Sequence, residues 1–316
     1  MYAMARATML ALVVLCLGFP ASARPLSGAN GAATLSELYN LDFSTGNITV
    51  FRIVKNVASV VSQFKASATG STGLAVDRRG RIYTAVNGLN AKPCTACVEV
   101  FSPHGGLVAR IAAPILPGAP GAPNVTDVSV DDHDNIYVSD YGQQAVYMFS
   151  PDPTGWVGPT IVVQNSLNAA SVTAEPDGVT VLVSGGCGFA SVRPYVRTTV
   201  GYPEFRPGAC FPIGTLGLFG AAVENDDTAI TPVDVFPGLV SMTSPSGGFS
   251  FTIPDRLGGV GGVARGGSDI VYVSDSHNQT VYAFARPAKG WLSGQPTLIG
   301  SYTGFQGLDV IAVPPH

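Results

Sequence analysis

The sequence predicts an all-β protein built from a repeated β-hairpin, and three observations support this prediction. The stretch NIYVSDYGQQAVYMFSP at Asn135–Pro151 recurs as IVYVSDSHNQTVYAFARP at Ile270–Pro287 and as LYNLDFSTGNITVFRI at Leu38–Ile53. The chain contains 38 Gly and 24 Pro without a collagen period, which is typical of many turns between short strands. Beyond the first residues, no stretch shows a sustained apolar period of 3.6 residues.

The spacing of the repeats predicts how many there are. Each unit has an apolar pair, a strand that closes at one position, a short polar turn and a second strand. The closing positions are Asp42, Val86, Asp140, Gly185, Asp234 and Asp275. Successive positions are 41 to 54 residues apart, which suits a four-stranded blade with variable loops. We therefore expect a six-bladed β-propeller, with five or seven blades as the alternatives.

The first unit lacks an innermost strand, because only a Ser-, Gly- and Ala-rich segment precedes Leu38. The C-terminal stretch Gly307–Val313, GLDVIAV, resembles the innermost strand of the second unit at Gly73–Asp77, GLAVD. We expect the C-terminal strand to join the first blade and close the ring, because closure removes two free sheet edges.

Small residues precede the polar turns of the later units, as expected for strands that crowd around an axis. These turns are Asp77–Gly80, Asp131–Asp134, Glu175–Gly178, Glu224–Asp227 and Arg265–Ser268. Two units share a further spacing, with Trp156 seven residues after Phe149 and Trp291 seven residues after Phe284. We expect each indole to cover a blade edge.

The N-terminus has the pattern of an export signal. Arg6 precedes an apolar run at Met9–Phe19, and Ala21-Ser22-Ala23 offers a cleavage site. The run is short for a membrane span. The expected organisation is a signal peptide at residues 1–23, a flexible lead at 24–37 and a single propeller domain at 38–316. The mature protein is expected to be secreted or periplasmic, without a membrane span.

Composition limits the partners. The formal net charge is -4 and charged residues make up 12% of the chain, without a basic cluster, so nucleic acid is not an expected partner. The four cysteines beyond the signal, Cys94, Cys97, Cys187 and Cys210, predict two disulfides in an exported protein. Of the three possible connectivities, Cys94–Cys97 with Cys187–Cys210 is favoured because both bridges are local.

The strings VDDHDNIYVSDYGQQAVYMFSPD and VYVSDSHNQTVYAF resemble NHL repeats, and by extension the six-bladed senescence-marker/gluconolactonase-like propellers. That resemblance implies the propeller fold. The group includes metal-dependent lactonases, a zinc lyase and binding modules without catalytic activity, so function does not follow from the fold. The Glu, two Asn and Asp that hold the metal in the lactonases have no matching set here. His104, His133 and His277 lie in turns of different units, without metal-ligand spacing.

Two groups of residues are candidate sites. Asp140, Asp234 and Asp275, with Asp42, suggest oxygen ligands for calcium or another divalent cation, although an Asp repeated at one position of each unit also fits an Asx turn. The aromatic residues Phe189, Tyr195, Tyr202 and Phe205, with Phe211, suggest a pocket or partner surface, or the small core of a long loop.

The favoured function is a monomeric binding or scaffolding module without an assigned cofactor or catalytic residue. Its ligand would be a protein, a peptide or a carbohydrate. The ligand would bind on the rim that carries the insertions Asn87–Cys97, Pro114–Pro123 and Val200–Leu218. The alternative is a metal-dependent lactonase or hydrolase that uses the three Asp residues.

Overall fold

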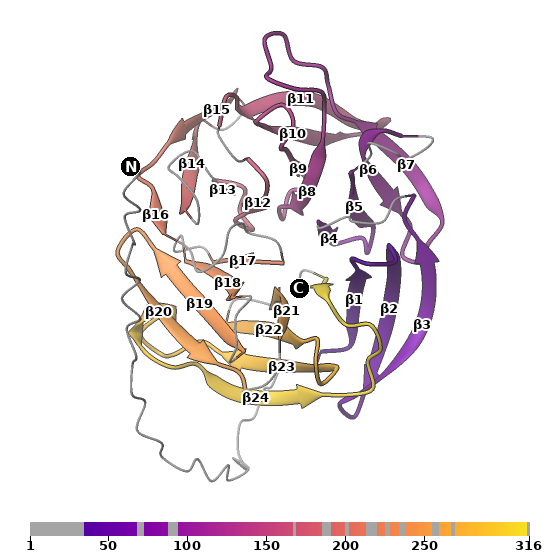
Figure 1. Ribbon diagram of the computed structural model, residues 1–316, viewed down its shortest axis with the longest axis vertical. Helices are drawn as coiled ribbons and strands as arrows, with labels where there is room; N and C mark the ends of the chain where they lie inside the picture. The colour runs from indigo at the N-terminus through magenta and orange to yellow at the C-terminus, as the bar shows by residue number, and fades with distance from the viewer. Residues whose placement is uncertain are drawn as a thin grey trace, which may run out of the picture. The chain divides into compact units, whose positions relative to one another are not determined.

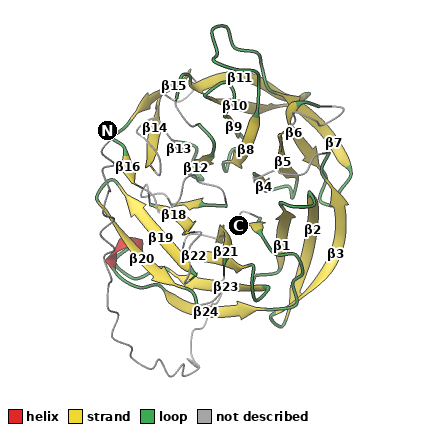
Figure 2. Ribbon diagram, viewed as in Figure 1, coloured by secondary structure: helices red, strands yellow, loops and turns green. Residues whose placement is uncertain are grey.

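The computed structural model describes residues 35–67, 73–87, 94–166, 169–184, 191–199, 202–212, 220–224, 228–233, 238–254, 259–266 and 269–314, with the backbone alone at 199 and 202–204. The chain divides into two units, residues 1–32 and 33–316, and the described residues belong to the second. Six antiparallel sheets surround an axis in this unit (Figure 1). Strands make up nearly all of its regular structure, beside the 3-10 turn η1 (Trp291–Ser293) (Figure 2). The predicted six-bladed β-propeller is confirmed.

The blades are numbered in chain order, and their strands are given from the axis outward. The first blade contains β25 (Val310–Ala312), β1 (Glu37–Asp42), β2 (Asn47–Val54) and β3 (Val57–Lys65). The second contains β4 (Leu74–Val76), β5 (Ile82–Asn87), β6 (Ala96–Phe101) and β7 (Leu107–Ala112). The third contains β8 (Val125–Val130), β9 (Ile136–Asp140), β10 (Ala145–Asp152) and β11 (Gly155–Val163).

The remaining three blades follow the same plan. The fourth contains β12 (Val172–Ala174), β13 (Thr180–Ser184), β14 (Ser191–Thr199) and β15 (Tyr202–Pro207), and β16 (Phe211–Pro212) also pairs with β14. The fifth contains β17 (Ala222–Val223), β18 (Ala229–Val233), β19 (Leu239–Ser244) and β20 (Gly247–Thr252). The sixth contains β21 (Val260–Gly266), β22 (Ile270–Asp275), β23 (Thr280–Ala285) and β24 (Thr297–Tyr302).

The C-terminal strand closes the ring as predicted. β25 pairs antiparallel with β1, with Tyr39 opposite Ala312, Asn40 opposite Ile311 and Leu41 opposite Val310. The first blade is thus assembled from both ends of the propeller, and its innermost edge is covered by the tail of the chain.

The core consists of layers between neighbouring blades. Six large hydrophobic clusters among the described residues each combine side chains of two consecutive blades, the sixth and first included. Strands in the middle of a blade are therefore buried on both faces, as in β9, where all five residues are buried. Such strands are nearly continuous apolar runs because neither face meets water.

The two tryptophans predicted to cover blade edges pack against the preceding blade in each case. Trp156 of the third blade lies edge-on to Tyr83 of the second, with ring centroids 5.9 Å apart. Trp291 of the sixth blade is fully buried in a cluster shared with the fifth. No helix in the described part of the chain is long and apolar enough to cross a membrane.

Candidate binding site in the axial cavity

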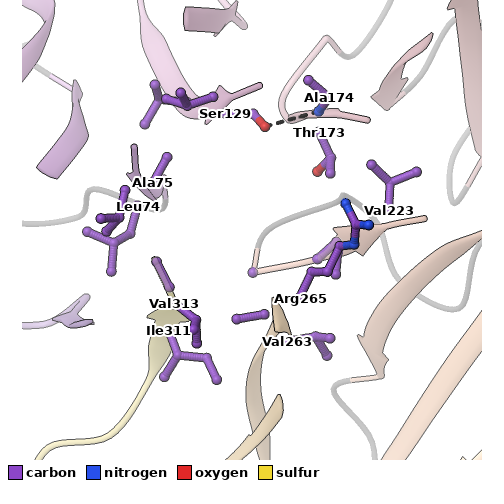
Figure 3. Close-up of a pocket in the computed structure, with 18 of the residues that line it drawn as sticks. Leu74, Ala75, Ser129, Thr173, Ala174, Val223, Val263, Arg265, Ile311 and Val313 are labelled. Carbon is purple, nitrogen blue, oxygen red and sulfur yellow. Dashed lines mark hydrogen bonds between the residues drawn. The ribbon is translucent and has the colours of Figure 1, made fainter. Parts of the chain in front are cut away.

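A cavity of about 530 Å³ lies on the axis, and all six innermost strands contribute to its wall (Figure 3). Strand pairing shows that the wall consists of three stacked rings, each with one residue from every blade. Each residue of the middle ring is paired with an aromatic or aliphatic residue near the start of the neighbouring strand, as in Ala75 opposite Tyr83, Ser129 opposite Tyr137 and Ala264 opposite Tyr272. A volume of this size suits a small organic ligand.

The three rings are named here by their distance from the turn that follows each innermost strand. The turn-side ring is Val76, Val130, Ala174, Val223, Arg265 and Val313. The middle ring is Ala75, Ser129, Thr173, Ala222, Ala264 and Ala312. The far ring is Leu74, Val128, Val172, Ala221, Val263 and Ile311. Asp127, Asp132, Pro176 and Gly220 complete the lining.

Small residues in the middle ring keep the axis open. Four of its six members are alanine, and the other two are Ser129 and Thr173. Ser129 is partly committed to the fold, because its hydroxyl oxygen accepts a 3.0 Å hydrogen bond from the amide of Ala174 in the next blade. The side chains of the three rings are thus mostly aliphatic, with a few separated polar groups.

Arg265 is the exception in the turn-side ring, where the other five blades place valine or alanine. Sequence reasoning assigned Arg265 to a turn. The structure corrects this assignment, because Arg265 lies within β21 and pairs with Val271. Its Nε is 3.2 Å from Oε2 of Glu224, an ion pair whose side chains are 21% and 2% exposed. Figure 3 shows the guanidinium in the cavity wall, on the side where Val223 and Thr173 lie.

Asp127 is the second exception to the repeat. In the other blades the residue that precedes the far ring is Gly73, Ser171, Gly220, Gly262 or Val310. Asp127 follows an irregularity in the β8–β9 register, and such bulges redirect side chains. Its Oδ1 accepts a 2.9 Å hydrogen bond from the amide of Val128, and its Oδ2 accepts one of 3.1 Å from Val172 in the fourth blade. Burial raises the pKa of Asp127 well above its usual value.

Gly73 makes room for the Asp127 carboxylate. A Cβ at residue 73 would lie 2.5 Å from Oδ1 of Asp127 and equally close to the amide nitrogen of Val128. The second, third and fourth blades are therefore interlocked at this level of the channel. Asp127 thus links neighbouring blades while it also lines the cavity.

The predicted metal ligands that the structure describes serve their own turns. Oδ1 of Asp140 accepts hydrogen bonds from the amides of Asn124 and Gln143, at 2.8 and 2.9 Å. Its Oδ2 accepts bonds from Gln143 Nε2 and the Tyr147 hydroxyl, at 2.8 and 3.0 Å. Burial, together with the Asp140 charge, raises the pKa of Tyr147. Tyr147 therefore keeps its proton at neutral pH.

Asp275 and Asp42 accept hydrogen bonds from the two amides of their own turns. Oδ1 of Asp275 accepts bonds from the amides of His277 and Asn278, and Oδ1 of Asp42 accepts bonds from those of Ser44 and Thr45. These are Asx turns. Neither Asp140 nor Asp275 lines the cavity, and Asp234 lies outside the described residues. The part of the chain that the structure describes brings together no group of three or more His, Cys, Asp or Glu suited to a metal ion.

The predicted Cys94–Cys97 disulfide is present, at the start of β6. Cys210 is also disulfide-bonded, and its sulfur accepts a 3.2 Å hydrogen bond from Nε of Arg193. Cys187, its predicted partner, lies outside the described residues.

The aromatic candidates are divided among several environments. Tyr195 is 5% exposed and belongs to the core between the third and fourth blades, where Phe205 packs edge-on to Tyr137 at 6.5 Å. Phe211 is buried between the fourth and fifth blades. Phe189 and the side chain of Tyr202 lie outside the described residues, so their role on the rim stays a prediction.

The predicted rim lies where the innermost strands begin, whereas the cavity wall extends along these strands to the turns where they end, at Asp132 and Pro176. Nε2 of Gln143 donates to the carbonyl of Pro114 at 2.6 Å, and its Oε1 accepts from the amide of Leu116 at 2.7 Å. The insertion at Pro114–Pro123 is thereby attached to the β9–β10 turn, where innermost strands begin. The three rings instead approach the turns where those strands end. Sequence reasoning missed the cavity, although an Arg at a position of repeated Val was a visible signal.

Comparisons with known proteins agree on the class of fold. No family model and no curated protein matches the sequence. A Bacteroides caccae protein of unknown function has a similar structure, with a TM-score of 0.55 at 11% identity over 88% of this chain and 98% of that one. U3-55K has a TM-score of 0.53 at 10% identity, over 88% and 81% of the two chains. A Bacteroides uniformis protein provisionally assigned as a 6-phosphogluconolactonase has a TM-score of 0.50 at 15% identity, over 84% and 83%. At these identities the likeness concerns the fold alone.

Proposed function

We propose that this protein is a binding module that takes the apolar part of an organic ligand, or of an extended peptide, into the axial cavity. The observation that carries the proposal is the composition of the three rings, in which aliphatic side chains from six blades surround one cavity. Burial of apolar ligand surface there is favourable by roughly 25 cal/mol per Å². The resemblance of the hairpins to NHL repeats, a group that includes binding modules, also supports this reading.

The proposed location, processing and partners of the protein are taken from the sequence. We propose an exported, monomeric protein, cleaved after Ala23, with a protein, peptide or small organic partner. The mass of the mature protein after expression with its leader tests the cleavage site.

Occlusion of the cavity tests the binding function. The hydrocarbon probe diphenylhexatriene, which fluoresces in apolar surroundings, is titrated into the purified protein. We expect saturable binding by the wild type and its loss in Ala174→Phe, which places a ring in the turn-side ring. The matched control is Val108→Phe on β7, where Val108 is 57% exposed, and it should bind as the wild type does. Equal binding by Ala174→Phe and wild type would reject the cavity as the site.

A metal-dependent lactonase or hydrolase is the second candidate. Its support is the fold shared with the Bacteroides uniformis protein and the repeated Asp residues. The described Asp140 and Asp275 do not fit a metal site as they stand, because their carboxylates already accept hydrogen bonds from nearby backbone amides. Hydrolysis of gluconolactone that depends on added calcium, zinc or manganese would favour this candidate over a binding module.

A further inference from the structure

The guanidinium of Arg265 is the feature of the cavity that an apolar ligand alone does not explain. Every other blade places valine or alanine at this ring position, so an aliphatic residue would satisfy the packing of the fold. A partly buried guanidinium carries a desolvation cost that such a residue avoids. An added polar group among hydrophobic walls is typical of a site that orients a ligand.

The ion pair with Glu224 leaves one side of Arg265 available. The ion pair is formed by Nε of Arg265, but the geometry of this contact is not that of a hydrogen bond. No hydrogen bond joins Nη1 or Nη2 to any side chain or carbonyl in the described ranges. Figure 3 shows the guanidinium at the cavity wall, with the Thr173 hydroxyl on a neighbouring part of the same wall. Nη1 and Nη2 of Arg265 are therefore the two nitrogens that can donate a hydrogen bond to a ligand oxygen in the cavity.

The surrounding charges decide which oxygen suits this position. Glu224 is 2% exposed and already supplies a negative charge to Arg265. Asp127 and Asp132 also line the cavity, and Asp132 is paired with Arg78 at 2.7 Å. A ligand carboxylate would place a second anion on one guanidinium among other acidic groups, which is unfavourable where the dielectric is low. An uncharged carbonyl accepts the same bonds without that repulsion.

We propose that the cavity selects an apolar ligand with an uncharged carbonyl group, an amide, ester, lactone or ketone, and that Arg265 donates to the carbonyl oxygen. The inference rests on the binding function proposed above and adds the class of ligand. Glu224 acts as a positioning residue that holds the guanidinium at the wall and neutralises it.

A matched pair of competitors tests the proposal. Octanamide and octanoate have the same chain and differ in charge at pH 8, and each is used to displace diphenylhexatriene from the full-length protein. We expect octanamide to displace the probe at a concentration at least about tenfold lower, since octanoate would bring a second anion into a partly buried site that already holds Glu224. In Arg265→Val/Glu224→Gln, the hydrocarbon should still bind and the affinity for octanamide should fall by about tenfold, because the hydrogen bond to the charged guanidinium is lost.

Further variants separate the possible outcomes. Arg265→Lys keeps the ion pair and the charge, so it controls for a double variant that fails to fold, and it should weaken octanamide severalfold while it leaves the hydrocarbon unchanged. Thr173→Val tests the neighbouring wall without a change in charge. If octanoate competes as well as octanamide, or if the Arg265 variants keep the wild-type affinity for octanamide, the carbonyl proposal is wrong while the binding module stands. If the hydrocarbon does not bind the wild type at all, the proposed function itself fails.

Discussion

The amide of Asp309 donates a 2.7 Å hydrogen bond to Oδ1 of Asn40, which lies 269 residues earlier in the chain. Nδ2 of the same Asn40 donates a 2.7 Å bond to the carbonyl of Gly307. Asn40 is 1% exposed and sits opposite Ile311 in the β1–β25 pair. One buried amide side chain therefore attaches the two ends of the propeller, in addition to the backbone ladder.

Replacement of Asn40 should weaken ring closure. Asn40→Ala removes both bonds and leaves the Gly307 carbonyl and the Asp309 amide without their partner, for an expected loss of about 2–4 kcal/mol in the free energy of unfolding. Chemical denaturation measures the loss. Gln63→Ala is the control, because Gln63 is exposed and bonds only the Thr49 hydroxyl, and it should cost less than about 0.5 kcal/mol. An unfolding free energy unchanged by Asn40→Ala would show that the ladder alone closes the ring.

Asp140 should stabilise the third blade through its turn. Asp140→Asn keeps the shape of the side chain, but its amide nitrogen cannot accept the bonds from Gln143 Nε2 and the Tyr147 hydroxyl. We expect a loss of about 2–4 kcal/mol, because buried donors lose their acceptor. Asp152→Asn is the control at a partly exposed position of the same blade and should lie near the wild type.

The wild type and Asp140→Asn also distinguish the two possible roles of Asp140, stabilisation of its turn and coordination of a metal ion. If Asp140 serves only its turn, the melting temperatures of wild type and Asp140→Asn should not respond to calcium, zinc or manganese. A ligand that binds the folded state raises stability. A rise with one of these ions in the wild type that Asp140→Asn abolishes would assign Asp140 to a metal site.

Asp127 should make stability depend on pH in the acidic to neutral range. Burial raises its pKa above the ordinary 3.8, so the folded protein holds this proton more tightly than the unfolded chain. Stability contributed at this position is therefore present at low pH and falls as pH rises from about 4 through the raised pKa. No charged side chain contributes to this pKa shift. Burial raises the pKa of Asp127, and the hydrogen bonds from the amides of Val172 and Val128 lower it by less. In thermal unfolding between pH 4 and 8, the difference in stability between the wild type and Asp127→Asn should decrease as the pH rises. A difference that stays constant over this range would contradict the prediction.

The two tryptophans should differ in their contribution to stability. Trp291 is fully buried against the fifth blade, so Trp291→Ala should cost about 3–5 kcal/mol. Trp156 is only partly buried, and its ring lies 4.9 Å from the Arg81 guanidinium, so Trp156→Ala should cost less. Denaturation of both variants compares them. A larger loss for Trp156 would mean that the cation–aromatic contact outweighs burial.

Much of the fold was predictable because its information is local and repeated. An apolar hairpin with Asp at one position recurs in the first, third and sixth blades, and each copy encodes the same turn through its own Asx bonds. The roles of Asp140 and Asp275 in their turns were one of the two readings that this pattern allowed.

The sequence by itself determined the hairpin and the strand that closes the ring, and it favoured six blades over five or seven, since each follows from spacing and from the likeness between segments of one chain. The tertiary structure alone decided what faces the axis. Arg265 and Asp127 stand in the cavity because six innermost strands from distant parts of the chain align in register there. That alignment depends on packing between blades, which no local pattern records.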